Sequence, residues 1–184
     1  MACHLETERL LLRPPEAEDV RSIVNLVGDY DVAKNLSRVP HPYSEDDARG
    51  WVTRANGEAR AKGTDFPFAI TRKDDGAYIG SCGLHLGEGG FFELGYWLGK
   101  PYWKMGYATE AARKVAGFAF HTLKAERLVA GWFHDNPASG HVLEKVGFVA
   151  DGADQRDCLA RGHAVYCNKV VLERENFGRR KVAA

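Results

Sequence analysis

The stretch from Glu93 to Ala112 holds the residues whose types and spacing could do chemistry. It reads ELGYWLGKPYWKMGYATEAA, in which an aromatic-rich strand pattern, Phe91 to Leu98, breaks at glycine, lysine and proline before a helix near Gly106. A strand that turns into a helix presents free backbone N–H groups and the positive end of the helix dipole to an anion. Because Gly106 has no side chain, a phosphate could approach the backbone closely there.

The residues alone leave two interpretations of this turn open. The first is a phosphate site, although the turn is neither a GxGxxG motif nor a Walker A loop. The second is an ordinary strand–turn–helix with a glycine at its bend. The same choice arises at Asn136, which is followed by Pro137. It is either a plain N-cap with proline at the first helical position or a residue that binds a ligand.

Composition bounds the class of protein. The chain has 184 residues, enough for one domain with a substantial core. Lys and Arg together number 25, as do Asp and Glu, so no global field favours nucleic acid or a membrane. No apolar run approaches the roughly 20 residues of a membrane helix, and the N-terminus lacks the apolar core of a signal peptide. We therefore expect a cytoplasmic protein with no nucleic-acid and no membrane partner.

The cysteines indicate neither a metal site nor a redox motif. Cys3, Cys82, Cys158 and Cys167 form no CxxC pair, and the seven histidines are scattered. We expect reduced, mostly structural thiols and no metal. The basic tail, residues 179–181, is predicted to be a solvated end rather than a nucleic-acid contact.

Periodicity and breaking residues predict the elements that must position this stretch. The predicted order is strand, two helices, three strands, helix, strand, helix and two strands. The strands are expected at residues 7–13, 66–71, 78–86, 91–98, 127–134, 148–150 and 163–172, and the helices at 16–27, from 44 onward, at 106–123 and at 136–146. A crossover containing a helix makes strands 91–98 and 127–134 parallel neighbours, connected right-handed. Ser44 with Asp47 resembles a capping box, and Gly147 suits a helix C-cap.

Two motifs give the chain a family resemblance. GYWLGKPYWKMGYATEA, followed downstream by DNPASGHVLEKVGF, resembles the GNAT superfamily of acyl-coenzyme A-dependent N-acetyltransferases. It looks most like the RimJ/RimL-like branch, the ribosomal-protein N-terminal acetyltransferases. The resemblance runs from about Thr7 to Phe177. It implies a single GNAT-like domain over residues 1–184 with a tail at 178–184. The implied fold class is α+β, with a mixed, mostly antiparallel central sheet flanked by helices and one parallel strand pair splayed for acetyl-CoA.

By this resemblance acetyl-CoA is the co-substrate and is held largely by backbone groups. The pantetheine arm would lie between the splayed strands and the diphosphate on the N–H groups of the turn. The implied cofactor-binding residues are Tyr96, Trp97, Leu98, Lys104, Met105, Gly106, Tyr107, Ala108, Thr109, Asn136 and Ser139. The chain departs from the family pattern at Trp103, where Arg or Gln is usual. It departs again at Gly140 and His141, where the branch often has Arg, so the contact to the adenosine 3′-phosphate stays open.

Two catalytic residues follow from the resemblance and the chemistry of amines. Many GNATs protonate the departing thiolate with a Tyr at the position of Leu143, so Ser139 is the remaining candidate, as a donor to the sulfur. The amine must lose a proton, and Glu93 occupies a position where a carboxylate acts as base in several lineages. His85 or a water is the alternative base. Glu93 could equally be a partly exposed strand carboxylate bonded to a neighbour.

The expected function is transfer of an acetyl group from acetyl-CoA to a primary amine by direct attack in a ternary complex. The amine would belong to a peptide or ribosomal-protein N-terminus, or to a small molecule, and the protein would be a monomer or homodimer. The alternative is an acyl-CoA-binding sensor or structural GNAT-fold protein with little turnover. The acceptor is expected to meet loops 32–43 and 152–162, in which we find no selective pattern. Glu110, beside the turn, is expected to face away from the diphosphate.

Overall fold

The computed structural model describes residues 4–87 and 89–178, so Cys3 and the basic tail at 179–181 lie outside the described residues. Its strands are β1 Leu5–Glu6, β2 Leu10–Arg13, β3 Asp65–Arg72, β4 Tyr78–Leu86, β5 Phe92–Leu98, β6 Arg127–Phe133, β7 Val149–Cys158 and β8 His163–Glu173. The helices are α1 Val20–Val27, α2 Tyr30–Ala33, α3 Glu45–Ala55, α4 Glu58–Ala61, α5 Tyr107–His121 and α6 Pro137–Val146. Short 3-10 turns occupy Ala17–Asp19, Lys100–Tyr102 and Arg174–Asn176. In this part of the chain no helix has the length and apolar character to cross a bilayer.

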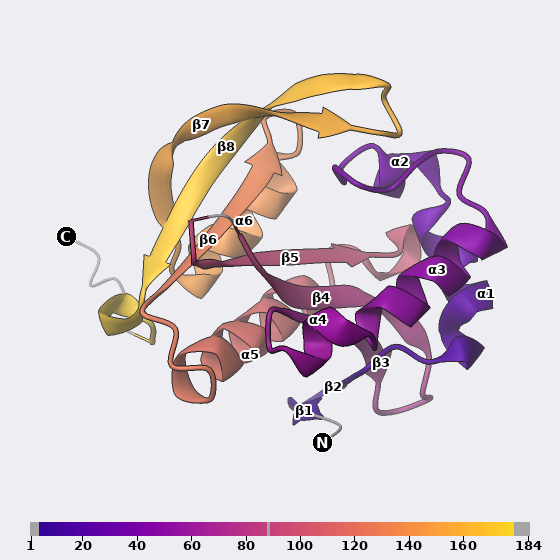
Figure 1. Cartoon of the computed structure of the whole chain (residues 1–184), viewed down its shortest axis with the longest axis horizontal. Coiled ribbons are helices and arrows are strands. Elements are labelled where there is room, and N and C mark those ends of the chain that lie inside the picture. The colour runs from indigo at the N-terminus through magenta and orange to yellow at the C-terminus, as the bar shows by residue number, and fades with distance from the viewer. Residues whose placement is uncertain (1–3, 88, 179–184) are drawn as a thin grey trace.

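The strands form one mixed sheet, in the order β1-β2-β3-β4-β5-β6-β8-β7 (Figure 1). Every neighbouring pair is antiparallel except β5 and β6, which are parallel and are joined through α5. The predicted parallel pair and the predicted α+β fold class are therefore confirmed. Parallel neighbours need a crossover of this kind, because a tight turn can join only antiparallel strands.

Helices cover both faces of the sheet, and each face has its own core. Helix α5, together with α6, packs on one face through buried residues that include Phe68, Phe120 and Leu128. Helices α1 and α3 pack on the other face, through Val20, Ile23, Val27, Val52 and Tyr78. Each fully buried side chain of this size contributes about 1.5–3 kcal/mol relative to an exposed one. The two cores therefore stabilise the sheet from both of its faces.

Two of the predicted helix ends are confirmed in atomic detail. At the start of α3, the Asp47 N–H donates to Ser44 Oγ at 3.1 Å, and the Ser44 N–H donates to Asp47 Oδ2 at 2.9 Å. This is the reciprocal arrangement of a capping box, with Asp in place of the usual Glu. Helix α6 ends at Gly147, whose φ of 118° lies in the left-handed region that favours glycine.

The prediction for the segment after α6 was wrong. We expected a short strand at 148–150 and a polar loop at 152–162, whereas β7 continues to Cys158 and pairs with β8 along its length. A bulge between Ala150 and Ala153 interrupts the ladder, and Gly152 lies within it at a φ of 90°. Most β7 side chains are exposed, so the segment lacks the apolar alternation that marks a strand in sequence. Backbone pairing with β8 forms this strand.

Candidate active site

Strands β5 and β6 separate almost as soon as they meet. Their parallel register holds only at Phe92 with Leu128 and at Glu93 with Val129. Beyond these pairs β5 continues to Leu98, still paired to β4, while β6 stays paired to β8 (Figure 1). The sheet therefore opens into a V-shaped gap, and strand-edge backbone beyond Glu93 is left without a strand partner on that side. This is the splayed pair that the sequence predicted.

The turn at the far end of β5 directs backbone donors outward. Lys104 and Gly106 both have left-handed backbones, with φ of 63° and 83°. Within the described residues, the N–H groups of 104–109 have no hydrogen-bond acceptor. The indole of Trp103 donates to the Leu98 carbonyl at 2.8 Å and ties the turn to the end of β5. A helix start with several free donors is a strong place for an anion.

Glu110, in the first turn of α5, is held by the N-terminal segment. Its carboxylate accepts from Thr7 Oγ1 at 2.6 Å, from the Arg9 N–H at 3.0 Å and from Arg9 Nε at 2.7 Å. Burial works to raise the pKa of Glu110, but these hydrogen bonds and the charge of Arg9 lower it overall. Arg9 Nη1 in turn donates to the Met105 carbonyl of the turn at 3.0 Å. That Glu110 faces away from a bound diphosphate stays a prediction.

Asn136 begins α6 without acting as a plain N-cap. Its side chain makes no capping hydrogen bond, and the helix start is closed instead by the Ser139 N–H, which donates to the Asn136 carbonyl at 3.1 Å. A plain N-cap accepts a helix N–H through its side chain. The half-buried amide therefore keeps its donors and its acceptor for something other than the helix.

Ser139 is held from across the gap by Tyr96. The Tyr96 hydroxyl lies 2.8 Å from the Ser139 carbonyl oxygen and 2.9 Å from Ser139 Oγ. Burial raises the pKa of Tyr96, and the hydrogen bond to Ser139 offsets only part of that rise. Leu143, one turn further along α6, is buried in the core. No sequence signal announced this contact, because the two residues are 43 positions apart.

The residue after Ser139, Gly140, is glycine because a larger side chain would collide with Trp132. A Cβ on Gly140 would lie 2.7 Å from the indole ring of Trp132, on β6. Real Cβ atoms essentially never approach this closely, so the Arg that the branch often carries at this position could not fit without moving Trp132. The departure from the family pattern is therefore built into the packing of β6 on α6.

Glu93 is ion-paired with Arg156, a residue that the sequence reasoning missed. Arg156 Nη1 donates to Glu93 Oε1, and Arg156 Nε lies 3.3 Å from Asp154 Oδ1. Burial lowers the pKa of Arg156, but the hydrogen bond and charge of Glu93 raise it overall. The side chain of Glu93 remains 35% exposed. The geometry thus shows a strand carboxylate bonded to a neighbour, and the role of Glu93 as the base stays a prediction.

His85, the second candidate base, lies beside Glu93. The two are directly opposite in the β4–β5 register, so their side chains share a face of the sheet. His85 Nδ1 is 4.0 Å from Asp65 Oδ1, and the side chain is 49% exposed. Tertiary structure therefore keeps both candidates at the narrow end of the gap.

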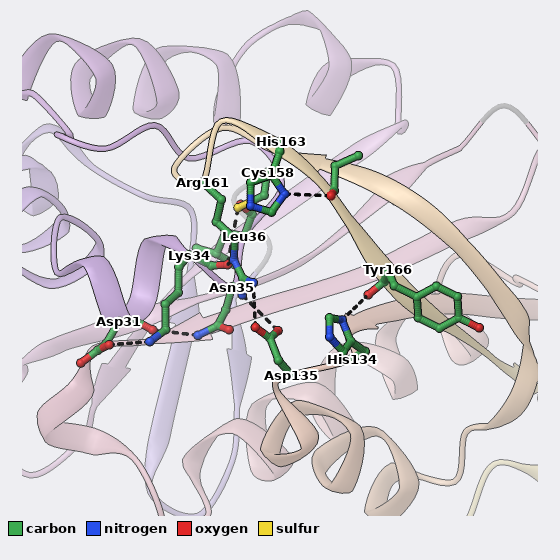
Figure 2. A network of polar contacts seen from close by, with 11 residues as sticks. Asp31, Lys34, Asn35, Leu36, His134, Asp135, Cys158, Arg161, His163 and Tyr166 are labelled. Atoms are coloured by element: carbon green, nitrogen blue, oxygen red, sulfur yellow. Dashed lines mark hydrogen bonds and ion pairs between the residues drawn. The ribbon is translucent and has the colours of Figure 1, made fainter.

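Five residues join the open ends of the two strands, and we call them the polar bridge: Asp31, Lys34, Lys100, Asp135 and Arg161. Lys100, just beyond β5, binds Asp31 at 2.5 Å, and Asp31 binds Lys34 at 2.6 Å. Arg161 Nε donates to the Lys34 carbonyl at 2.7 Å, and its guanidinium pairs with Asp135, just beyond β6, at 2.7 and 3.1 Å (Figure 2).

The tip of the β7–β8 hairpin is thereby fastened to the segment after α2. The thiol of Cys158 lies 3.4 Å from the Leu36 carbonyl, and the Leu159 N–H donates to the Ser37 carbonyl at 3.2 Å. Figure 2 shows Arg161 between Lys34 and Asp135. Of the two segments expected to meet the acceptor, 32–43 begins within α2, and 152–162 is mostly strand β7 rather than a loop. Their contact with an acceptor stays a prediction.

Comparison with known proteins agrees with this geometry. Residues 9–149 match the family model of the acetyltransferase (GNAT) domain. A Bacillus licheniformis protein named uncharacterized N-acetyltransferase p20 is 31% identical, over 80% of this chain and 83% of its own length. A GNAT-family acetyltransferase from Bacillus anthracis has a TM-score of 0.81 at 23% identity, covering 94% of this chain and 99% of its own. Mycobacterium smegmatis RimJ, solved with CoA-disulfide, has a TM-score of 0.80 at 20% identity, covering 97% and 89%.

The fold and the site define a GNAT-type acyltransferase, and the family match shows that the chain belongs to the GNAT family. It is an N-acetyltransferase of that family, as the two sequence motifs predicted.

Proposed function

We propose that the chain transfers an acetyl group from acetyl-CoA to a primary amine by direct attack within a ternary complex. The observation that carries this proposal is the gap between β5 and β6, which has a turn of free N–H groups at its wide end. An extended arm with amide groups fits beside an unpaired strand edge, as an added strand does. A diphosphate fits the helix start. Family membership supports the same co-substrate.

The residues fit acetyl-CoA along the length of this gap. The backbone from Tyr96 to Leu98 would bind the pantetheine arm, and the N–H groups of 104–109 would bind the diphosphate. The uncommitted amide of Asn136 would bind the arm from the α6 side, and Ser139 would lie beside the sulfur. Gly106 supports this arrangement, since its exposed position and left-handed φ leave the backbone open to an anion.

The chemistry needs a neutral amine and a stabilised leaving group. Acetyl-CoA supplies the thioester carbon, and the chain's own groups handle the protons and the charge. Glu93 would accept the amine proton, directly or through a water, which is a modest task for an α-amine of pKa ~7.7–8.0 and a harder one for lysine at ~10.4. Ser139 would donate a hydrogen bond that strengthens as charge grows on the sulfur. Backbone N–H groups of β5 would polarise the carbonyl oxygen.

The polar bridge favours an acceptor whose amine lies on a flexible peptide end or on a small molecule. It links the segments that follow β5 and β6, so the amine would reach Glu93 past residues that ion pairs hold in place. An amine at a flexible peptide end, or on a small molecule, suits this approach better than a lysine on a folded surface. The resemblance of the two motifs to the RimJ/RimL-like branch supports a peptide N-terminus.

The test is an acetyl-CoA turnover screen across peptide N-termini, amino acids, polyamines and aminoglycosides, read as release of free CoA. We expect release with at least one class, and the acetylated product identified by mass. Tight binding of CoA without release for any amine would overturn the enzyme proposal in favour of an acyl-CoA sensor. The sensor is the second candidate because Leu143 replaces the usual Tyr acid and Trp132 excludes an Arg at Gly140.

A further inference from the structure

We infer that Tyr96 is a positioning residue for acetyl transfer, which holds the hydroxyl of Ser139 toward the sulfur of the co-substrate. The inference rests on the proposed function, because it needs Ser139 beside the sulfur. It assigns the Tyr96 side chain a role beyond the backbone contact implied by the family resemblance.

The contact joins the two sides of the gap. Tyr96 comes from β5, and Ser139 comes from the first turn of α6, which follows β6. Among the hydrogen bonds of residues 4–87 and 89–178, those between Tyr96 and Ser139 are the ones that connect β5 to α6. The Tyr96 ring packs against the main core, so its hydroxyl has little freedom to move away from Ser139. A fixed partner therefore limits the rotamers of a small, otherwise mobile side chain.

Proton accounting decides what the pair can do. Each hydroxyl has one proton, and the Ser139 carbonyl can only accept, so the 2.8 Å bond to that carbonyl uses the proton of Tyr96. Ser139 is then free to donate its own proton, either to Tyr96 Oη or to an acceptor in the gap. A developing thiolate is a stronger acceptor than a phenol oxygen, because charge-assisted hydrogen bonds are the stronger ones. The Ser139 hydroxyl would turn to the sulfur and give up its bond to Tyr96 Oη, while Tyr96 would still hold the residue through its hydrogen bond to the Ser139 carbonyl.

Tyr96 is an anchor in this scheme and not an acid. Its burial favours the neutral phenol, so it keeps its proton over the range in which the acceptor amine loses one. In the transfer step the amine nitrogen bonds to the acyl carbon, and the carbon–sulfur bond breaks with its electron pair on sulfur. The amine proton passes to the base. The thiolate is held by the Ser139 hydrogen bond until it takes a proton from water, so no proton leaves Tyr96.

This scheme explains how a chain without the usual Tyr can still hold its leaving group. The usual position is Leu143, which is buried with 1% of its surface exposed and is committed to the core. The phenol of Tyr96 comes instead from the opposite side of the gap and acts through Ser139.

The test needs no acceptor amine. Binding of CoA and of desulfo-CoA, which lacks the sulfur, is measured by calorimetry at about pH 6.5 and about pH 9.5, on either side of an ordinary thiol pKa of ~8.5. Wild type, Tyr96→Phe, Ser139→Ala and the double variant are compared, and thermal melts establish that each is folded. Tyr78→Phe is the matched control, since its buried hydroxyl has no hydrogen-bond partner among the described residues and lies in the other core.

We expect the affinity ratio of CoA to desulfo-CoA to rise with pH about tenfold more in wild type than in Ser139→Ala. That is the equivalent of one hydrogen bond to a charged group. Tyr96→Phe should lose most of this difference, the double variant should equal Ser139→Ala, and Tyr78→Phe should behave as wild type. A Tyr96→Phe variant with the full wild-type rise overturns the inference while leaving Ser139 in place. A full rise in Ser139→Ala overturns the role of Ser139 and the inference with it. No binding of CoA by wild type overturns the proposed co-substrate.

Discussion

Arg156 on β7 reaches the carboxylate of Glu93 on β5, and its guanidinium passes over Gly131 on β6. A Cβ on Gly131 would lie 3.3 Å from Arg156 Cζ and 2.8 Å from Cys167 Sγ, so the space for this side chain exists because residue 131 is glycine. This ion pair connects β7 to β5 at the narrow end of the separation between β5 and β6. The candidate base is therefore oriented by a residue 63 positions away.

The first prediction concerns Glu93 as the base. Glu93→Gln keeps the shape and one hydrogen bond to Arg156 but loses the basicity. Acetyl-CoA affinity should stay near normal while kcat falls by roughly 10²–10⁴, the usual range for a general base. Steady-state kinetics from pH 6 to pH 9 should show the loss shrinking as pH rises, since more of the amine is then neutral. Wild-type turnover at neutral pH would exclude Glu93 and move attention to His85.

The second prediction tests whether the close approach of Arg156 to β6 needs a glycine at position 131. Gly131→Ala should displace Arg156 and Cys167 and lower the free energy of unfolding by about 1–3 kcal/mol, the usual cost of overpacking. Gly95→Ala is the matched control, because a Cβ there meets nothing within 4 Å and its φ is not left-handed. Urea unfolding measures both. Equal stabilities of the two variants would contradict the close approach over Gly131.

The third prediction tests the turn as the diphosphate site. Gly106→Asp adds bulk and negative charge at the free N–H groups, so acetyl-CoA binding by calorimetry should be lost. Gly76→Asp is the control: Gly76 has a φ of 72° against 83° for Gly106, and its Cβ would meet nothing within 4 Å, whereas a Cβ on Gly106 would lie 3.3 Å from Arg9 Nη2. It therefore carries similar backbone strain and the same charge away from the turn. Unchanged affinity in a folded Gly106→Asp would remove the turn from the site.

The fourth prediction concerns the polar bridge and pH. The hydrogen bonds from Arg161 lower the pKa of Asp135. A lowered carboxyl pKa gives stability that is present above the unfolded value of ~3.9 and is lost as pH falls through the folded value. Arg161→Ala should therefore raise the pKa of Asp135 toward ~3.9 and remove this part of the acid dependence.

Carboxyl NMR titration checks the shift, and Asp31 provides the internal control. Hydrogen bonds from Lys100, the largest cause, and from Lys34 lower the pKa of Asp31 to about 2. Arg161 bonds to the carbonyl of Lys34, whereas Asp31 is bound by the Lys34 ammonium. Asp31 should thus titrate unchanged in Arg161→Ala. An Asp135 carboxyl that titrates as in wild type would show that Arg161 does not control it.

The sequence alone determined the parts of the site that are continuous along the chain. The strand, turn and helix from Glu93 to Ala112 lie within one stretch, so local rules of turns and helix starts predicted the free donors near Gly106. The parallel β5–β6 pair followed from the length of the crossover between them. Family motifs then indicated Asn136 and Ser139, because motifs record local spacing.

Only the tertiary structure decided which side chains meet. Glu93 bonds to Arg156, Ser139 to Tyr96 and Asp135 to Arg161. The two residues of each pair come from elements far apart in sequence. No sequence pattern indicates Arg156, because the exposed residues of β7 have no apolar alternation and predict a loop. The pairing of β7 with β8 is made by backbone groups that every residue has. Periodicity reports which face of an element is buried, whereas the partner of a polar side chain depends on how the packed elements are placed in space.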